Sequence, residues 1–236
     1  MNRDDDNSLG ERSPKDREFI ERYLSGERLP WGLVLKKGVS SVLFDPWLTL
    51  LKYLDGPIGF KLRQLYYARR FRYMGDGVLI DPGATVMGPE NISMDRLSYL
   101  ARRGCLVATE GYIRIGKRSH IGSWVLGHGG VEIGNYVGAG NSSILSATDS
   151  HRGGYRMAGP MIPMEQRNVK KAKVVIEDDA FIGHFSTIMP GVTIGEGAIV
   201  SPNSLVVGDV EPWTVVKGSP AVAFSRRKKV RFPPPD

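Results

Sequence analysis

The sequence predicts an all-β core folded as a parallel β-helix, a solenoid in which the chain winds through three-sided coils. Aliphatic residues recur every six positions, a period that matches neither the 3.6 residues of a helical turn nor the two-residue alternation of an isolated strand. Each flat face of a triangular coil takes one inward aliphatic side chain per six residues, so this period fits a solenoid. The 29 glycines among 236 residues exceed the average of roughly 7% and agree with frequent tight turns.

The six-residue repeat occurs in three runs. The aliphatic positions, which we expect to point inward, are Ile80, Val86 and Ile92, then Ile115, Ile121, Ile133 and Leu145, then Ile176, Ile182, Ile188, Ile194, Val200 and Val206. The two in-phase positions missing from the second run hold Gly127 and Ala139. Six consecutive positions in phase make the third run the strongest part of the signal.

The repeat divides the chain into four parts. Residues 76–215 form the predicted β-helix domain, and residues 216–236 form a short basic extension. Residues 1–28 are predicted to be a polar tail with a short helix. Residues 29–75 combine apolar and basic residues in short helices and form the predicted amphipathic segment.

The net charge of +7 is concentrated rather than evenly spread. Nine lysines and arginines but only two aspartates lie between Arg28 and Tyr73. Such a basic amphipathic segment is typical of a membrane surface, so residues 31–73 are predicted to associate peripherally with a membrane, or else to pack on the core or on a neighbouring subunit. In its last helix, Ile58 and Leu65 belong to the expected apolar face and Arg63 to the polar one. Because the centre of the chain is close to neutral, a nucleic-acid partner is not expected.

The cellular compartment follows from two further features. A single cysteine, Cys105, excludes an internal disulfide framework and a multi-thiolate metal site. The acidic start of the chain, at residues 1–6, lacks the apolar stretch of a signal peptide. We therefore expect a cytoplasmic protein, with the inner face of the cell membrane as its possible site of action.

One irregular segment interrupts the repeat. Leu145 and Ile176 lie 31 residues apart, which is one residue out of phase, and the interval is polar and rich in Met, Gly and Pro. We predict that residues 147–173 form a loop extruded from the coils, and loops of this kind tend to carry function. Of the four histidines, His151 alone lies on this loop.

The other three histidines have simpler expected placements. His120 precedes an inward residue and should point outward, and His128 lies in a glycine-rich turn with a surface role. His184, on a regular coil, is a weaker candidate for a cofactor groove.

The repeats, the loop sequence Asp149-Ser150-His151 and the stretches 179–183, 190–195 and 217–221 together resemble the hexapeptide-repeat acetyltransferases. The likeness covers residues 80–227, and within the superfamily the chain is most similar to O-acetyltransferases of bacterial polysaccharide assembly. The resemblance implies a left-handed β-helix, a homotrimer, acetyl-CoA as the donor substrate and a saccharide acceptor. It also implies active sites at subunit boundaries and no metal.

The resemblance assigns roles to individual residues. It makes His151 the general base that deprotonates a sugar hydroxyl, a task suited to an imidazole that titrates near 6.5. Asp149 orients this imidazole, contacts the acceptor, or only forms a turn. Ser186 and Ser204 match positions that contact the pantetheine arm. Many relatives hold the cofactor phosphate with a lysine where this chain has Gly208, so the predicted replacements are Lys217, Arg226 and Arg227.

Three alternative functions remain. The same fold and donor serve N-acetylation of an amino sugar or an antibiotic, and the sequence does not separate amine from hydroxyl acceptors. A β-helical carbonic anhydrase needs three histidines on zinc, and the spacing of the histidines here lacks that family's close pair. A non-catalytic structural solenoid gives no reason for a polar, histidine-bearing loop.

Overall fold

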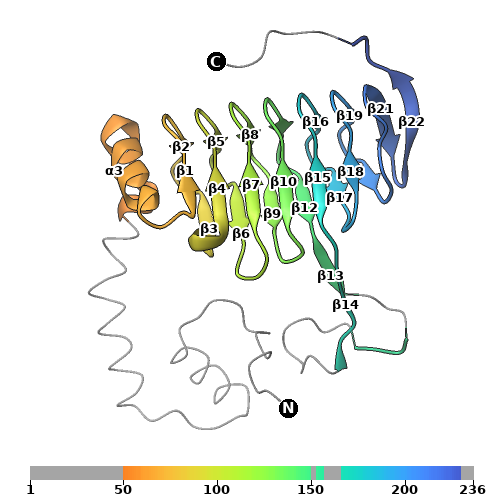
Figure 1. Cartoon of the computed structure of the whole chain (residues 1–236), viewed down its shortest axis with the longest axis horizontal. Coiled ribbons are helices and arrows are strands. Elements are labelled where there is room, and N and C mark those ends of the chain that lie inside the picture. Colours follow the sequence, from red (N-terminus) through yellow and green to blue (C-terminus); the bar gives the residue numbers. More distant parts are fainter. Residues whose placement is uncertain (1–49, 150–152, 157–165, 230–236) are drawn as a thin grey trace.

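The computed structural model describes residues 50–149, 153–156 and 166–229. Its body is a row of stacked coils, and each coil contributes one short strand to each of three parallel sheets (Figure 1). We call these sheets A, B and C in the order in which the chain meets them. The turns that join them form three rows, the A–B, B–C and C–A corners. This is the predicted β-helix.

The three sheets have the following strands. Sheet A contains β1 (Tyr73–Met74), β4 (Ile92–Met94), β7 (Ile113–Ile115), β10 (Val131–Ile133), β15 (Val174–Ile176) and β18 (Thr193–Ile194). Sheet B contains β2 (Leu79–Ile80), β5 (Tyr99–Leu100), β8 (His120–Ile121), β11 (Gly138–Ala139), β16 (Phe181–Ile182), β19 (Ile199–Val200), β21 (Thr214–Gly218) and β22 (Ala221–Arg226). Sheet C contains β3 (Thr85–Met87), β6 (Cys105–Val107), β9 (Trp124–Leu126), β12 (Ser143–Leu145), β17 (Thr187–Ile188) and β20 (Leu205–Val206).

The core is a set of aliphatic columns inside the coils. Ile121, Ile182 and Val200, from successive positions of the repeat, are fully buried on the inner face of sheet B. Residues in register on stacked strands have the same orientation, so each face contributes a continuous apolar column and its backbone groups pair with the coils above and below. The predicted inward positions are correct throughout the third run.

Two predicted positions of the second run are wrong. Leu145 is only half-buried, and its neighbour Ile144 fills the core instead. In the preceding coil the inward residue of sheet C is Val125, two positions before Gly127. The physical reason is that the B–C corner is shorter in these two coils, so the strand of sheet C begins one or two residues earlier than the six-residue repeat predicts.

The chain closes the first end of the solenoid with α3 (Gly56–Ala68), which follows an N-terminal cap made by the carboxylate of Asp55 (Figure 1). Arg63 points inward from this helix and is only 2% exposed. Its guanidinium donates to the carbonyl oxygens of Ile80, Leu51 and Leu54 at 2.8, 3.0 and 2.6 Å. Within the described residues no strand of sheet B stacks before β2, so Arg63 satisfies the Ile80 carbonyl at this end of the sheet and ties it to the segment that precedes α3.

The amphipathic pattern predicted for this helix is wrong at Arg63, which is assigned to the polar face but is buried. Its burial follows from the backbone carbonyls that its guanidinium satisfies. Ile58 and Leu65, assigned to the apolar face, are 71% and 47% exposed, so this face does not pack on the core of the same chain. Membrane association of residues 31–73 stays a prediction. Residues 1–49 of the chain lie outside the described residues.

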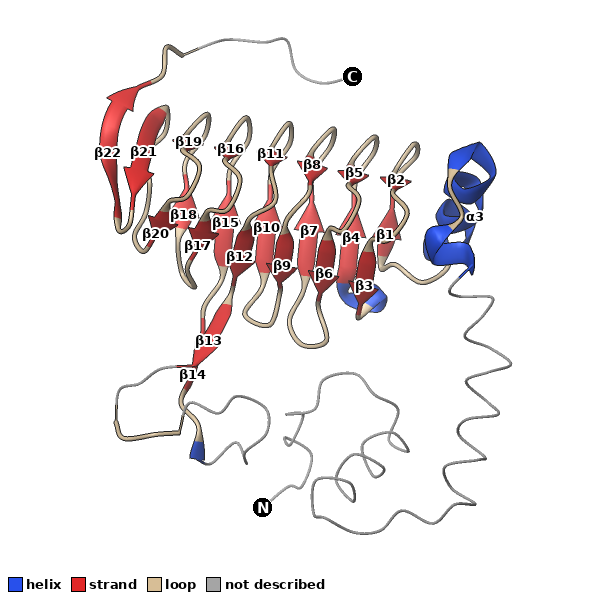
Figure 2. Cartoon of the chain, turned by 180° about the vertical axis from the view of Figure 1, so that it is seen from behind, coloured by secondary structure: helices blue, strands red, loops and turns tan. Residues whose placement is uncertain are grey.

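At the other end of the solenoid, β21 and β22 form an antiparallel hairpin that extends sheet B. A second hairpin, of β13 (Ala147–Asp149) and β14 (Val169–Lys171), leaves the solenoid at the C–A corner (Figure 2). The chain thus leaves the coils after β12 and returns at β15. One further element, the 3-10 turn η1 (Pro89–Asn91), lies at the same corner.

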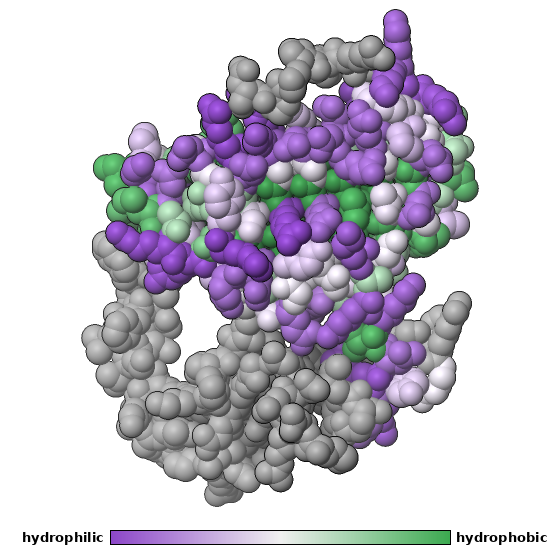
Figure 3. All heavy atoms as spheres, in the orientation of Figure 1, coloured by the Kyte–Doolittle hydropathy of each residue, from purple (hydrophilic) through white to green (hydrophobic). Residues whose placement is uncertain are grey.

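Polar residues cover the rims of the solenoid, and an apolar band runs along the middle of the face shown in Figure 3. Within the ranges that the structure describes, every helix is too short or too polar to traverse a lipid bilayer.

We predict that Arg63→Met destabilises the protein by about 3 kcal/mol, because the substitution keeps the volume of the side chain but leaves buried carbonyl groups without donors. The measurement is the free energy of unfolding at a fixed protein concentration. Lys61→Met, an exposed position on the same helix, is the matched control and should change it by less than about 0.5 kcal/mol. Equal effects of the two variants would refute the capping role.

Candidate active site

The B–C corner is regular in four coils and shortened in two. From the inward residue of sheet B to the first residue of sheet C the chain takes five steps at most coils, as from Ile182 to Thr187. It takes three from Ile121 to Trp124 and four from Ala139 to Ser143. The B–C turns of these two coils are therefore one or two residues shorter than those of the neighbouring coils.

The shortened turns open a cavity of about 420 Å³ in the corner. The residues that line it are Arg103, Gly122, Trp124, Asn141, Ser142, Ser143, Phe185, Ser186 and Thr187. They come from four successive coils, so the cavity runs along the axis of the solenoid. Its size is in the range of small-molecule sites, and its lining combines two aromatic side chains with several polar ones.

Buried serines support the corner from inside. Ser123 donates to the carbonyl of Gly140 at 2.7 Å and pairs with Ser142 at 2.8 Å between the two hydroxyl oxygens. Ser186 donates to the carbonyl of Ser201 at 2.9 Å, and its oxygen accepts from the N–H of Ser204 at 3.3 Å. These hydroxyls satisfy backbone groups where the chain turns sharply.

The structure places Ser186 and Ser204 at this one corner, in successive coils, as their spacing of eighteen residues predicts. Both are almost fully buried. The oxygen of Ser204 accepts from the N–H of Gly218 at 3.2 Å, so both side chains are engaged inside the coils. A contact with a pantetheine arm would therefore use the outer surface of their turns, and their cofactor role stays a prediction.

The predicted phosphate-binding residues lie at two different corners. Lys217 is exposed near the B–C corner, next to the Gly218 that bonds Ser204, and its ammonium lies 3.3 Å from the ring centroid of Phe224. Arg226 pairs with Thr214 at the far end of β21, three residues from Lys217, or about 10 Å at roughly 3.3 Å per residue. Arg227 donates to the carbonyls of Asp179 and Gly197 at 3.2 and 3.3 Å, at the A–B corner.

Of these cations, Lys217 is the one that shares a corner with both serines. Among the residues that the structure describes, it has no carboxylate within ion-pairing distance, so its charge is available to a phosphate. The guanidinium of Arg227 is instead committed to two carbonyls and to the face of Trp213 at 5.3 Å. Cofactor binding by Arg226 and Arg227 stays a prediction, and it would require a ligand that also reaches the A–B corner.

The loop that carries the predicted base begins at the opposite edge of sheet C. Asp149 is the last residue of β13, and its backbone pairs with Val169 of β14. His151 lies outside the described residues. Because the hairpin leaves at the C–A corner and the cavity opens at the B–C corner, sheet C separates the base of the loop from the cavity within one chain (Figure 2).

The three described histidines lie on different sides of the solenoid. His120 is exposed on sheet B and stacks on Tyr99, with ring centroids 4.8 Å apart, as its predicted outward orientation requires. His184 is exposed at the B–C corner, where its Nδ1 accepts from the N–H of Asn141 at 3.2 Å. It therefore contacts a residue that lines the cavity, and its role in a cofactor groove stays a prediction. Within the described ranges, no cluster of three or more metal-binding side chains is present.

His128 lies at the C–A corner, beside the base of the hairpin. Its Nε2 is 3.0 Å from Oγ1 of Thr109, and Glu110 and Lys171 form an ion pair close by. Burial lowers the pKa of His128, with a smaller opposing effect of Glu110. The imidazole is thus held in its neutral form next to the segment that leads to His151.

Comparison with known proteins identifies the family. Residues 173–208 match the family described as bacterial transferase hexapeptide (six repeats). A dTDP-4-amino-4,6-dideoxy-D-glucose acyltransferase from Escherichia coli is 33% identical over 162 residues, which cover 67% of this chain and 84% of that protein. The chain belongs to the hexapeptide-repeat acyltransferases. As a member of that family it is an acyltransferase, and the predicted fold, an all-β left-handed parallel β-helix with an N-terminal helix, is confirmed.

Two further similarities concern a curated relative and a solved structure. A putative lipopolysaccharide biosynthesis O-acetyltransferase of Escherichia coli K12, WbbJ, is 34% identical over 84 residues, which cover 34% of this chain and 43% of that protein. Among solved structures, AntD, an N-acyltransferase from Bacillus cereus in complex with dTDP and 3-hydroxybutyryl-CoA, matches 70% of this chain and 88% of its own length. That match has a TM-score of 0.61 and 26% identity.

We predict that His128 titrates below the ordinary histidine value of about 6.5. The unfolded chain then takes up this proton at a higher pH than the folded protein does, so stability is fully present above about pH 6.5 and falls as the pH drops toward the pKa of the folded state. Thermal midpoints at about pH 7.5 and about pH 5.5 measure this loss. His128→Gln should reduce it, whereas His120→Gln, at an exposed position, should leave it as in the wild type. An equal acid loss in His128→Gln and wild type would exclude this role.

Proposed function

We propose that the protein transfers the acetyl group of acetyl-CoA to a hydroxyl of a surface-polysaccharide or lipid-linked saccharide precursor, with His151 as the general base. The observation that carries the proposal is the cavity at the B–C corner, which adjoins Ser186 in a member of an acyltransferase family. Acyl-CoA fits the part of this corner that continues from Ser186 through Ser204 to the unpaired cation of Lys217. The acceptor then occupies the cavity itself.

The reaction needs little covalent help from the protein. The acceptor oxygen attacks the thioester carbonyl while its proton passes to the imidazole of His151, and a tetrahedral oxyanion forms. Collapse of this intermediate releases the thiolate of CoA, which takes the proton back from the imidazolium. A sugar hydroxyl is too weakly acidic to attack unaided near neutral pH, so this step depends on the base.

Two copies of the chain build each site in this proposal. The hairpin leaves at the C–A corner and the cavity opens at the B–C corner, so the loop of one subunit reaches the cavity of its neighbour. A closed ring of three copies, the homotrimer implied by the resemblance, repeats this head-to-tail contact three times. Because the neighbouring subunit supplies the general base in this proposal, the protein is active only as an oligomer.

Relatives of both acceptor types support a saccharide acceptor. The putative O-acetyltransferase WbbJ favours a hydroxyl. The relative that acts on dTDP-4-amino-4,6-dideoxy-D-glucose, together with the N-acyltransferase AntD, covers more of the chain and favours a second candidate, transfer to the amine of a nucleotide-linked amino sugar. A neutral amine is already nucleophilic, so N-acylation depends less on a base in the attack itself.

We predict that His151→Ala lowers the rate constant of acetyl transfer by about 10²–10⁴-fold, because no general base then accepts the proton of the acceptor hydroxyl. Single-turnover transfer from labelled acetyl-CoA measures it, and the exposed His120→Ala is the control. Transfer at the wild-type rate in His151→Ala would show that His151 is not the general base.

Co-expression checks the subunit arrangement with the same variant. Ser143→Phe fills the cavity and leaves the loop intact, whereas His151→Ala leaves the cavity intact. If loop and cavity come from neighbouring copies, mixed oligomers of the two inactive variants regain about a quarter of the wild-type activity. Mixtures that stay inactive would mean that each chain builds its own site.

We predict that the acetylated product carries an ester, which dilute hydroxylamine cleaves, and not an amide, which resists it. The assay supplies labelled acetyl-CoA with paired acceptors, a neutral sugar and its amino-sugar analogue, together with lipid-linked saccharide precursors. Label that survives hydroxylamine and appears only with the amino sugar would establish the second candidate in place of the first.

A further inference from the structure

The cavity at the B–C corner is lined by aromatic, uncharged polar and cationic side chains, a combination that acyl transfer alone does not require. One wall is the indole of Trp124, which is 59% exposed. In register on either side of it lie Cys105 and Ser143, both smaller, so nothing in the same column covers its ring. An exposed aromatic ring that forms the wall of a cavity can stack on a ligand bound there.

The opposite wall is Phe185, which is 73% exposed. Its backbone is held in the left-handed region at φ +61°, a conformation that only the tight corner explains. The N–H of Phe185 donates to the carbonyl of Asn141 at 2.6 Å, which fixes the turn that presents the ring. Trp124 belongs to the first shortened coil and Phe185 to the coil after the second, so the two aromatic side chains lie on either side of the coil of Asn141 and Ser143.

Polar groups without partners lie between these walls. Asn141 is exposed, Ser143 and Thr187 are half-buried, and none of their side chains makes a hydrogen bond with another described residue. By contrast, the buried serines beneath them are all engaged. Free amide and hydroxyl groups between two apolar walls suit a sugar ring, which offers apolar C–H faces and hydroxyls at its rim.

A single cation closes one end of the cavity. Arg103 lies in the N-terminal of the four coils, with a left-handed backbone at φ +66° and an exposed side chain. Within the described residues it has no carboxylate partner, whereas its neighbour Arg102 pairs with Asp55 at 2.8 Å. An unpaired guanidinium at the end of a sugar-sized cavity matches a phosphate or carboxylate, which it can bind with two parallel hydrogen bonds.

We infer that the cavity is an acceptor subsite for an anionic saccharide, in which Trp124 and Phe185 cover the sugar ring and Arg103 binds its phosphate or carboxylate. This inference rests on the proposed function and adds the class of acceptor. Arg103 and Thr187 are three coils apart, about 14 Å at roughly 4.8 Å per coil. The anion therefore lies at the end of the cavity remote from Ser186 and the donor, and the acetylated group lies on the far side of the ring from the charge.

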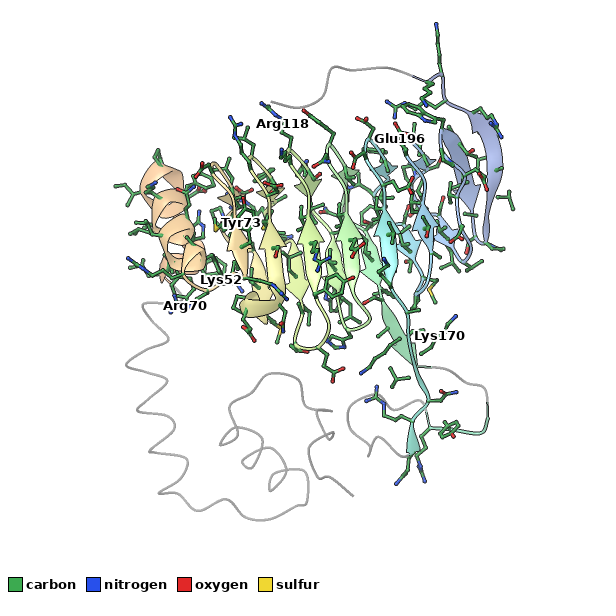
Figure 4. All side chains as sticks on the ribbon, viewed as in Figure 1. Lys52, Arg70, Tyr73, Arg118, Lys170 and Glu196 are labelled. Atoms are coloured by element: carbon green, nitrogen blue, oxygen red, sulfur yellow. The ribbon has the colours of Figure 1, made fainter. Side chains whose placement is uncertain are left out.

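The chain provides a matched control for the cation. Arg118 is also an exposed arginine with a left-handed backbone, at φ +54°, but it lies at the A–B corner on the rim seen in Figure 4. Arg103→Gln and Arg118→Gln remove the same charge from equivalent turns. The difference between the two variants in ligand affinity therefore measures the effect of a charge in the cavity, separately from the overall positive charge of the protein.

The aromatic wall has its own control. Tyr136 is an exposed aromatic residue with a left-handed backbone, at φ +56°, also at the A–B corner. Trp124→Ala and Tyr136→Ala compare an aromatic ring inside the cavity with one outside it.

Binding without the donor tests the inference independently of catalysis. Saturation-transfer NMR on the full chain uses methyl α-D-glucoside, α-D-glucose 1-phosphate and D-glucuronic acid as neutral, phosphorylated and carboxylated probes. Both anionic probes, or one of them, should bind more tightly than the neutral probe. Arg103→Gln should weaken anionic binding at least roughly tenfold, and Arg118→Gln should not. Trp124→Ala should weaken all three probes, and Tyr136→Ala none.

Kinetics then separates this inference from the proposed function. In Arg103→Gln the KM for an anionic acceptor should rise about tenfold while the KM for acetyl-CoA stays unchanged. A rise in the KM for acetyl-CoA instead would assign the cavity to the donor and overturn the inference. Preference for the neutral probe, or equal losses in Arg103→Gln and Arg118→Gln, would also overturn it. Selective anion binding in a wild-type protein that acetylates no saccharide would keep the subsite and reject the proposed function.

Discussion

The parallel stacking of coils is the constraint on which the rest of the molecule depends. Each strand pairs in register with the strands above and below it, and each inner face places an aliphatic side chain over the one beneath. The step from sheet A to sheet B is six residues in every coil, as from Ile115 to Ile121 and from Ile176 to Ile182. Strands of two or three residues hold little structure alone, so the columns and ladders of the whole stack stabilise each coil.

The coils differ from one another in the lengths of their corner turns, whereas the strands of the three faces do not tolerate insertions or deletions. A residue removed from a strand would move the whole inner column out of register, whereas a residue removed from a turn only changes the shape of that corner. The B–C corner loses two residues at Trp124 and one at Ser143, and the C–A corner gains a hairpin after β12. Cavity and loop are thus both products of turn length, imposed on a constant scaffold, and the buried serines satisfy the backbone of the shortened turns.

The regular faces could be predicted from the sequence, and the ends and corners could not. Six aliphatic residues in phase from Ile176 to Val206 identify the core because an inward position admits little else. In the second run the repeat is harder to follow, because Ala139 replaces a larger aliphatic residue at one inward position. Ile144 and Leu145 are both aliphatic, so the pattern does not reveal that Ile144 is the inward residue. Arg63 was unpredictable for a different reason: its burial follows from carbonyls at the open end, which only the folded stack creates. The local sequence likewise does not show which of two adjacent arginines is paired: Arg102 reaches Asp55, 47 residues earlier, whereas Arg103 has no carboxylate partner among the described residues.

The geometry of a solenoid favours the shared site of the proposed function, in which two copies of the chain contribute. A loop that leaves at one corner must cross an entire sheet to reach the next corner of its own chain. A neighbouring solenoid placed alongside presents its corner directly. In the proposed site, the linear order of residues along the corner sets the order of acceptor and donor: the cation of Arg103 first, the aromatic walls and free hydroxyls next, and Ser186, Ser204 and Lys217 last. Since each coil advances by about 4.8 Å, the distance between the charge of the acceptor and the thioester of the donor is counted in whole coils. A change in the size of the acceptor would therefore require a change in which turns are shortened, not a rearrangement of the core.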